Sequence, residues 1–201
     1  MIESIHDFWY MWLILIVLIA VTVFAAVKAS KAVKKRNSIM RKQREELERL
    51  KFLKEKYSRL TADLARESEA KELAEGVTAV LQLELEKSVN PDSEFLHAAK
   101  WRREVYALYY FDEDCARSLS FFFRHNERPL PDEALDGLAS VNIPRIRDIS
   151  LAMYAMYDDK NENVSLDNAR VEELDKKFNA VYDRDAFFES IKQYIIDNIE
   201  Y

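Results

Sequence analysis

The sequence predicts an all-α protein with one N-terminal transmembrane helix, and three observations lead to this prediction. The 201-residue chain has only two glycines and four prolines, too few for the many tight turns of a β-sandwich or barrel. A run of twenty uncharged residues lies near the N-terminus. Apolar residues then recur at helical spacing through most of the remaining chain. The expected order is a short extracytoplasmic N-terminus (1–7), a transmembrane helix (8–27), a basic juxtamembrane segment (28–44), a charged helix (45–75) and a cytoplasmic multi-helix bundle (76–201).

Residues 8–27 form the predicted transmembrane helix, in which Thr22 is the only clearly polar residue. At about 1.5 Å per residue, this segment spans about 30 Å, the thickness of the hydrocarbon core of a bilayer. Its ends carry residues typical of the membrane interface, namely Trp9, Tyr10, Trp12 and Lys28. A cleaved signal peptide is a poorer interpretation, because the preceding residues contain two acids and neither lysine nor arginine.

Residues 28–44 hold eight basic side chains and no acid. They are Lys28, Lys31, Lys34, Lys35, Arg36, Arg41, Lys42 and Arg44. The positive-inside rule therefore predicts a single-pass protein of the cell membrane (inner or plasma membrane), with its N-terminus outside and its body in the cytoplasm. These cations either act only as this topology signal or also bind anionic lipids of the inner leaflet, at about 1 kcal/mol per side chain.

The charged helix predicted for residues 45–75 carries one apolar stripe with alternating steps of three and four. Its members are Leu50, Leu53, Tyr57, Leu60 and Leu64. This is the spacing of a coiled coil, but it lasts little more than two heptads because Glu67 occupies the next expected position. The alternative is an amphipathic helix that packs against its own domain.

Three small residues, Thr22, Ala26 and Ser30, lie four apart in the cytoplasmic half of the anchor. Such a stripe lets helices approach closely in a membrane. Together with the stripe from Leu50 to Leu64, it suggests a homodimer or higher oligomer as a hypothesis.

The bundle is expected to begin at Gly76, a candidate kink or hinge. Asn90 and Pro91 are expected to end one helix, and Asp92 or Ser93 to cap the next. Residues 105–111 are apolar around the whole helix circumference and predict a central buried helix. Residues 112–114 read as the cap of a following helix.

Further helices are predicted near 132–138, from Pro144 to about Tyr157, after Ser165 and after Asp183. Four to six helices around one aromatic core are therefore expected.

No catalytic, metal or cofactor site is predicted. The loop at Asp159 resembles a calcium-binding loop superficially, but Val164 replaces its glycine and Arg170 its closing glutamate. Cys115, His97 and His125 could be a nucleophile with a base, but they are isolated residues without motif spacing. The acidic body, in a chain of net charge −6, also argues against a nucleic-acid partner.

The leading hypothesis is a membrane-tethered interaction or regulatory protein that binds a protein partner. One alternative is a membrane-tethered effector enzyme, such as a helical nuclease of a phage-defence system, for which Arg124 and His125 would be the residues to test. Another is a structural subunit of a membrane complex. Layout by itself assigns none of these roles.

Overall fold

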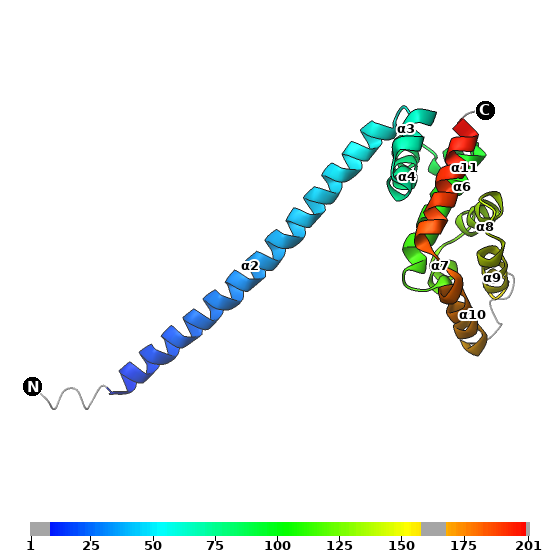
Figure 1. The fold of residues 1–201 in the computed structure, drawn as a ribbon. Coiled ribbons are helices and arrows are strands. Elements are labelled where there is room, and N and C mark those ends of the chain that lie inside the picture. The colour runs from blue at the N-terminus through cyan, green and yellow to red at the C-terminus, as the bar shows by residue number, and fades with distance from the viewer. Residues whose placement is uncertain (1–8, 158–167, 200–201) are drawn as a thin grey trace, which may run out of the picture. The chain divides into compact units, whose positions relative to one another are not determined.

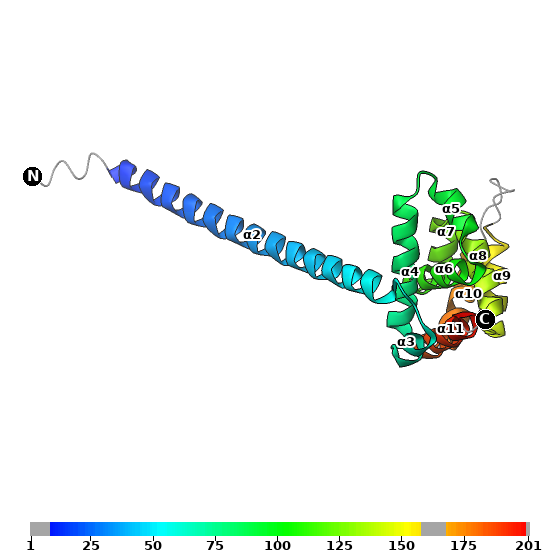
Figure 2. The same cartoon turned by 90° about the horizontal axis from the view of Figure 1, so that it is seen from above.

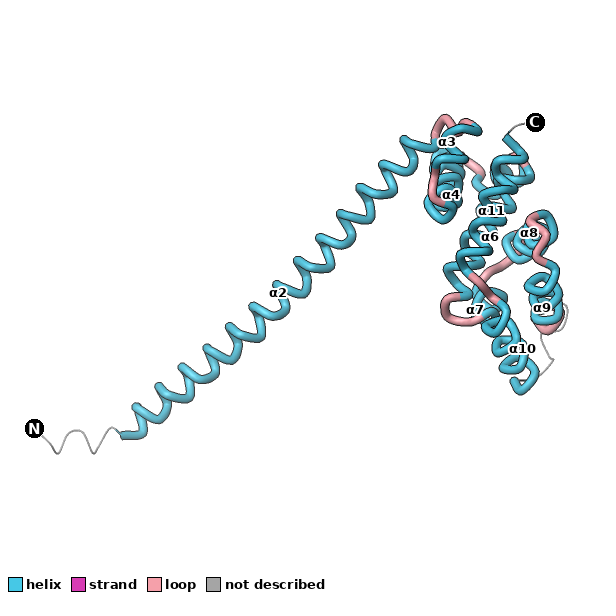
Figure 3. Tube along the Cα trace, in the orientation of Figure 1, coloured by secondary structure: helices cyan, strands magenta, loops and turns pink. Residues whose placement is uncertain are grey.

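A computed structural model of the chain describes residues 9–157 and 168–199, and for several residues between 9 and 38 it describes only the backbone. The elements in these ranges are all helices, which confirms the all-α prediction (Figure 1, Figure 3). The short N-terminus and most of the loop resembling a calcium site lie outside the described residues. The chain divides into two units, Met1–Arg49 and Leu50–Tyr201.

The described part of the first unit belongs to α2, a helix of 49 residues that spans Trp9–Tyr57. Its apolar side chains that the structure describes in the first half are all exposed: Met11, Trp12, Ile14, Leu15, Ile16, Val17, Leu18, Ile19 and Phe24. Among the residues that the structure describes, no helix has both the length and the apolarity needed to cross a membrane.

The second unit begins with the last two turns of α2 and continues through nine shorter helices in the described ranges. These are α3 (Ala62–Glu67), α4 (Ala70–Lys87), α5 (Pro91–His97), α6 (Lys100–Cys115), α7 (Leu119–His125), α8 (Leu130–Ser140), α9 (Pro144–Tyr154), α10 (Asn168–Val181) and α11 (Arg184–Ile199). Helix α6 packs against α4, α7, α8 and α11, and Figure 2 shows it among them. The helix predicted to be central is therefore central in the structure.

The core is organised around aromatic rings from four helices. Phe111 on α6 is fully buried, and its ring centroid lies 5.1 Å from that of Phe122 on α7 and 5.8 Å from that of Phe178 on α10. Phe187 on α11 lies 6.1 Å from the same ring. Burial of each such side chain stabilises the fold by about 1.5–3 kcal/mol, and edge-to-face pairs add about 0.5–1.5 kcal/mol.

Several helices start at a side-chain cap, and two of these caps differ from the sequence-based expectation. Asn90, rather than a residue after Pro91, accepts a hydrogen bond from the Ser93 amide at 3.2 Å. Ser118 starts α7, because residues 112–114 continue α6 instead of starting a new helix. Asp183 caps α11 as predicted, since it accepts a hydrogen bond from the Ala186 amide at 3.1 Å.

The stripe from Leu50 to Leu64 packs against its own domain, which was the alternative to a coiled coil. Leu53 and Tyr57 are 1% and 2% exposed, while Leu60 and Leu64 lie partly buried against the same core. The segment 45–75 is also not one helix: α2 ends at Tyr57, and Thr61 and Glu69 cap α3 and α4. The compact domain therefore begins near Leu50 and not at Gly76.

Gly76 is a site of close packing, and the expectation of a hinge there is wrong. It lies buried inside α4, and a Cβ atom at this position would overlap the side-chain ring of Tyr57. The missing side chain therefore lets the end of α2 lie directly against α4. Gly137 has the same role between α8 and α6, where a Cβ atom would lie 2.9 Å from Cγ of Leu108.

Replacing Gly76 by alanine should destabilise the domain. The added methyl group must displace the Tyr57 ring, and overpacking of this kind costs about 1–3 kcal/mol. Urea unfolding of the full-length protein, followed by circular dichroism, measures this loss. The control is A180S, which adds one atom to an exposed helix position and should change stability by less than about 0.5 kcal/mol. A stabilised G76A variant would instead support a flexible glycine.

Candidate functional site

A polar network fixes the end of α2 within the second unit. The Tyr57 hydroxyl lies 2.8 Å from Ser68 Oγ and 2.9 Å from Glu72 Oε1. Lys56 Nζ donates to the same Glu72 oxygen at 2.6 Å, and this hydrogen bond raises the pKa of Lys56. Burial raises the pKa of Tyr57, so its hydroxyl remains protonated and can donate.

Helix α11 supports this junction from another side. Lys192 Nζ donates to the carbonyl oxygens of Arg66 at 2.9 Å and Ser68 at 2.7 Å, which end α3. A cation at the end of a helix satisfies carbonyl groups that have no partner within the helix. Hydrogen bonds from α4, from the end of α3 and from α11 therefore hold the residues around the last turn of α2 in place.

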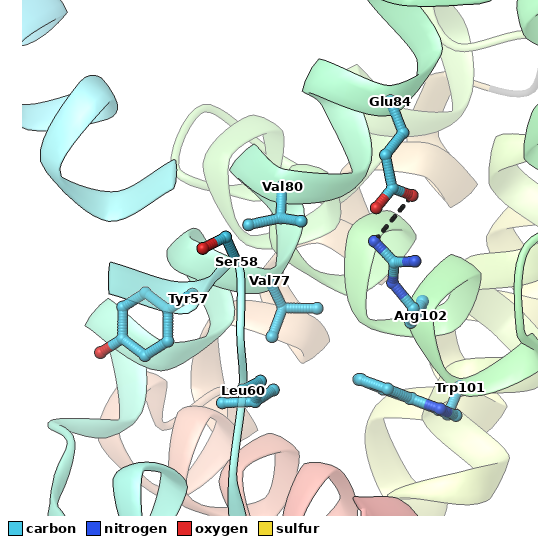
Figure 4. A pocket seen from close by; sticks show the side chains of 8 residues that line it. All are labelled: Tyr57, Ser58, Leu60, Val77, Val80, Glu84, Trp101 and Arg102. Atoms are coloured by element: carbon cyan, nitrogen blue, oxygen red, sulfur yellow. Dashed lines mark ion pairs between the residues drawn. The ribbon is translucent and has the colours of Figure 1, made fainter. Parts of the chain in front are cut away.

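A small pocket opens beside this junction, between the end of α2, α4 and the first turn of α6 (Figure 4). It is lined by Tyr57, Ser58, Leu60, Val77, Val80, Glu84, Trp101 and Arg102. Figure 4 shows Leu60, Val77 and Trp101 around the same open space. At its rim, Arg102 Nη2 forms an ion pair with Glu84 Oε2 at 2.9 Å.

The pocket suits an apolar side chain better than a cofactor. Its volume is about 150 Å³. Sites for cofactors and drug-sized ligands usually enclose about 300–1,000 Å³. A hollow with a tryptophan wall and a charged rim is instead typical of a hot spot, where a partner protein inserts one anchoring residue. We call this hollow the junction pocket.

Two buried acids on α6 have structural partners instead. Asp112 is 1% exposed, and it accepts hydrogen bonds from Tyr182 at 2.7 Å and from Arg184 Nε at 2.8 Å. Burial and the Asp112 charge raise the pKa of Tyr182, so this phenol stays a donor. Because both donors lie at the start of α11 or just before it, this cluster fixes α11 on α6.

Glu104 makes the second connection. It is fully buried and accepts hydrogen bonds from Ser140 Oγ at 3.1 Å and from the Tyr194 hydroxyl, with Lys100 Nζ at 3.3 Å. Burial raises the pKa of Tyr194. The carboxylate thus joins α6 to α8 and α11. Ser140 and Tyr194 also line a separate hollow, but Glu104 does not border it.

The isolated residues considered for catalysis are not brought together by any described contact. His97 Nδ1 lies 2.6 Å from the Ser93 carbonyl oxygen, and His125 Nδ1 lies 2.9 Å from that of Phe121, each within its own helix. Cys115 is buried, and burial followed by the Asp112 charge raises its pKa. A protonated, enclosed thiol is a poor nucleophile.

The other residues singled out from the sequence divide into two groups. Trp12, Lys28, Arg36, Arg41, Lys42 and Arg44 are exposed on α2. For Trp9, Tyr10, Thr22, Ala26, Ser30, Lys31, Lys34 and Lys35, the side chains lie outside the described residues. Within the described ranges, no cluster of three or more histidine, cysteine or acidic side chains could hold a metal ion.

Sequence reasoning missed the junction pocket as a site. Trp101 lies half-buried, with contacts both to the core and to the pocket wall, and its helical spacing in the sequence does not distinguish these two roles. Glu84 and Arg102 come from different helices, and no sequence signal pairs them. A comparison with protein-family models, curated proteins and solved structures found no match. The function is therefore argued from the residues of this chain.

Breaking the Asp112 cluster should unfold the domain more readily. R184M leaves the buried Asp112 carboxylate with Tyr182 as its remaining donor among the contacts described above, and because the Arg184 side chain is itself 45% exposed, the loss should be about 1–3 kcal/mol. K177M, which breaks the exposed pair with Glu173, is the matched control and should cost less than about 1 kcal/mol. Urea unfolding curves of both variants compare the two losses. Equal effects would show that the Asp112 pair has no special structural role.

The Cys115 thiol should react slowly while the protein is folded. Because burial raises its pKa, it should resist a disulfide reagent at about pH 8, where an exposed cysteine is partly ionised. Addition of urea should restore fast reaction. Absorbance after mixing with the chromogenic reagent measures both rates, and rapid labelling without urea would contradict the buried environment.

Proposed function

We propose that this protein is a membrane-anchored binding protein, in which residues 8–27 lie in the bilayer and the helical domain binds a partner at the inner surface. The observation that carries the proposal is the uninterrupted run of twenty uncharged residues, followed directly by eight cations without an acid. The rise of an α-helix gives this run the thickness of a bilayer core. The cations give its orientation.

The exposure of the first half of α2 supports the same proposal. Nine described apolar side chains between Met11 and Phe24 are exposed, on several sides of one helix. Water-soluble proteins rarely leave a continuous apolar surface of this extent uncovered. Lipid covers a helix around its whole circumference, whereas a partner chain covers one face. A bilayer therefore accounts for this surface better than a single protein contact.

The basic segment 28–44 supports a cytoplasmic domain. Lys28, Arg36, Arg41 and Lys42 are exposed, so anionic headgroups can reach their charges. Each such contact contributes about 1 kcal/mol. Arg41 also forms an ion pair with Glu45 at 3.3 Å, but this pair is exposed and contributes little by itself.

The role proposed for the domain is to hold a partner close to the membrane. The junction pocket provides a place for one anchoring side chain, and its walls are fixed by the network around Tyr57. Restriction to a surface raises the effective concentration of the domain near other membrane proteins, so that even a small contact area can be sufficient. This mechanism needs no catalytic residue.

Two lysines within the apolar run should release the protein from membranes. Each lysine near the centre of a transmembrane helix costs about 2.5–3.5 kcal/mol for insertion. Full-length protein should stay in the membrane pellet after alkaline carbonate extraction, while L15K/L18K should move to the supernatant. The matched control is M40K/L47K, which changes two exposed apolar residues of α2 outside the run and should remain in the pellet. Wild-type protein in the soluble fraction without detergent would refute the anchor.

The orientation is tested by protease treatment of intact cells. Residues beyond 45 should be protected until the membrane is opened with detergent, because the basic segment holds them inside. Degradation of the domain in sealed cells would place it outside and would exclude a cytoplasmic partner.

A further inference from the structure

A second surface of the domain, formed by α7, α9 and the residues next to them, combines arginines with aromatic rings. We call it the arginine-aromatic surface, and it comprises Arg117, Phe121, Arg124, Arg128, Tyr154 and Tyr157. We propose that this surface binds an acidic segment of a partner protein. This inference rests on the proposed role as a binding protein, but it does not depend on the membrane anchor.

The side chains of this surface hold one another in position. The guanidinium carbon of Arg117 lies 4.4 Å from the ring centroid of Phe121, which also stacks on His125 at 3.9 Å. Arg124 Nη2 donates to the Tyr157 hydroxyl at 3.3 Å. A guanidinium supported by a ring loses less conformational freedom when it binds a carboxylate.

Arg128 and Tyr154 extend the surface and mark its end. Arg128 Nε donates to the Tyr154 hydroxyl at 2.9 Å, and that hydroxyl donates to Asp132 at 2.7 Å. Asp132 also lies 3.5 Å from Arg128. The carboxylate of Asp132 therefore neutralises the charge of Arg128. The part of the surface that attracts an anion lies around Arg117 and Arg124.

The charges of Arg117 and Arg124 contrast with those of other cations in the domain. Arg102, Arg103 and Lys56 each contact a carboxylate at 2.9 Å or less. The described residues place no carboxylate within 4.0 Å of Arg117 or Arg124, whose guanidiniums contact aromatic side chains. Two supported guanidiniums with vacant donors on an acidic domain can receive carboxylates from outside, because arginine binds them through two parallel hydrogen bonds.

The composition of this surface favours a protein partner over a nucleic acid. Proteins that bind nucleic acids through the backbone typically contact about 6–10 phosphates. This surface offers three arginines, in a chain whose net charge is −6 despite the basic segment. Arginine and tyrosine are also the residues that most often dominate protein interfaces. A few carboxylates on one segment match the surface in number and charge.

The test is photo-crosslinking of full-length protein in detergent micelles. The probe is a short glutamate-rich peptide with a central benzoylphenylalanine, and mass spectrometry locates the crosslinks. Crosslinks in or next to α7 and α9 are expected, and R117Q/R124Q should reduce their yield about tenfold or more. The probe will also contact residues 28–44, whose crosslinks should be unchanged and so provide an internal control. R170Q, on the exposed pair with Glu173, is the matched control variant and should leave the α7 and α9 crosslinks unchanged.

Three results would overturn the proposal. The first is the absence of crosslinks near α7 and α9 at low salt. The second is an unchanged yield in R117Q/R124Q, with Cys115 still protected as a sign of folding. The third is that oligouridylate or phosphatidylglycerol, added to the micelles, lowers the yield of these crosslinks as much as unlabelled peptide does. That result would assign the surface to nucleic acid or lipid. Repeating the experiment with L15K/L18K separates the two proposals, since loss of the anchor should not change these crosslinks.

Discussion

Phe111 on α6 contacts Phe122, Phe178 and Phe187, and through them one buried ring joins four helices. The rest of the domain depends on this arrangement. Other contacts support the same arrangement, because α7 also buries Leu119 and Phe123, and Asp175 on α10 accepts hydrogen bonds from the Ser120 amide and hydroxyl. Aromatic pairs at edge-to-face angles fix orientation as well as burial. Two of these helices also carry residues of the proposed binding sites: α6 carries Trp101 and Arg102 of the junction pocket, and α7 carries Phe121 and Arg124 of the arginine-aromatic surface.

Buried charge adds specificity to this apolar core. Glu104 and Asp112 lie two turns apart on α6, and both accept hydrogen bonds from the end of the chain: Tyr194 for one, Tyr182 and Arg184 for the other. An ion pair in the interior contributes little net stability compared with apolar residues, but a displaced register would leave its charges unpaired. The two contacts therefore determine how α11 lies along α6.

The two proposed binding sites differ in what they offer a partner. The junction pocket is small and has both apolar and polar walls, with a charged pair at the rim, so it can accept a single side chain. The arginine-aromatic surface is open and carries two guanidiniums without carboxylate partners among the described residues. As proposed, the two sites would offer a partner one pocket for an anchoring residue and a few charges, and the proposed location at a membrane would strengthen such weak contacts.

The sequence by itself determined the all-α class, the central position of residues 105–111 and the cap at Asp183, because helix periodicity and capping are local properties. It also gives the basis for the proposed anchor, since a charge-free run and a cation cluster are properties of composition. Only the tertiary structure decided the partner of the stripe from Leu50 to Leu64, since an apolar stripe does not specify what covers it. It likewise showed that the Tyr57 ring packs directly against Gly76, where a side chain would overlap it. Glu84 with Arg102, and Arg124 with Tyr157, meet because distant helices pack together, and no local pattern encodes such pairs.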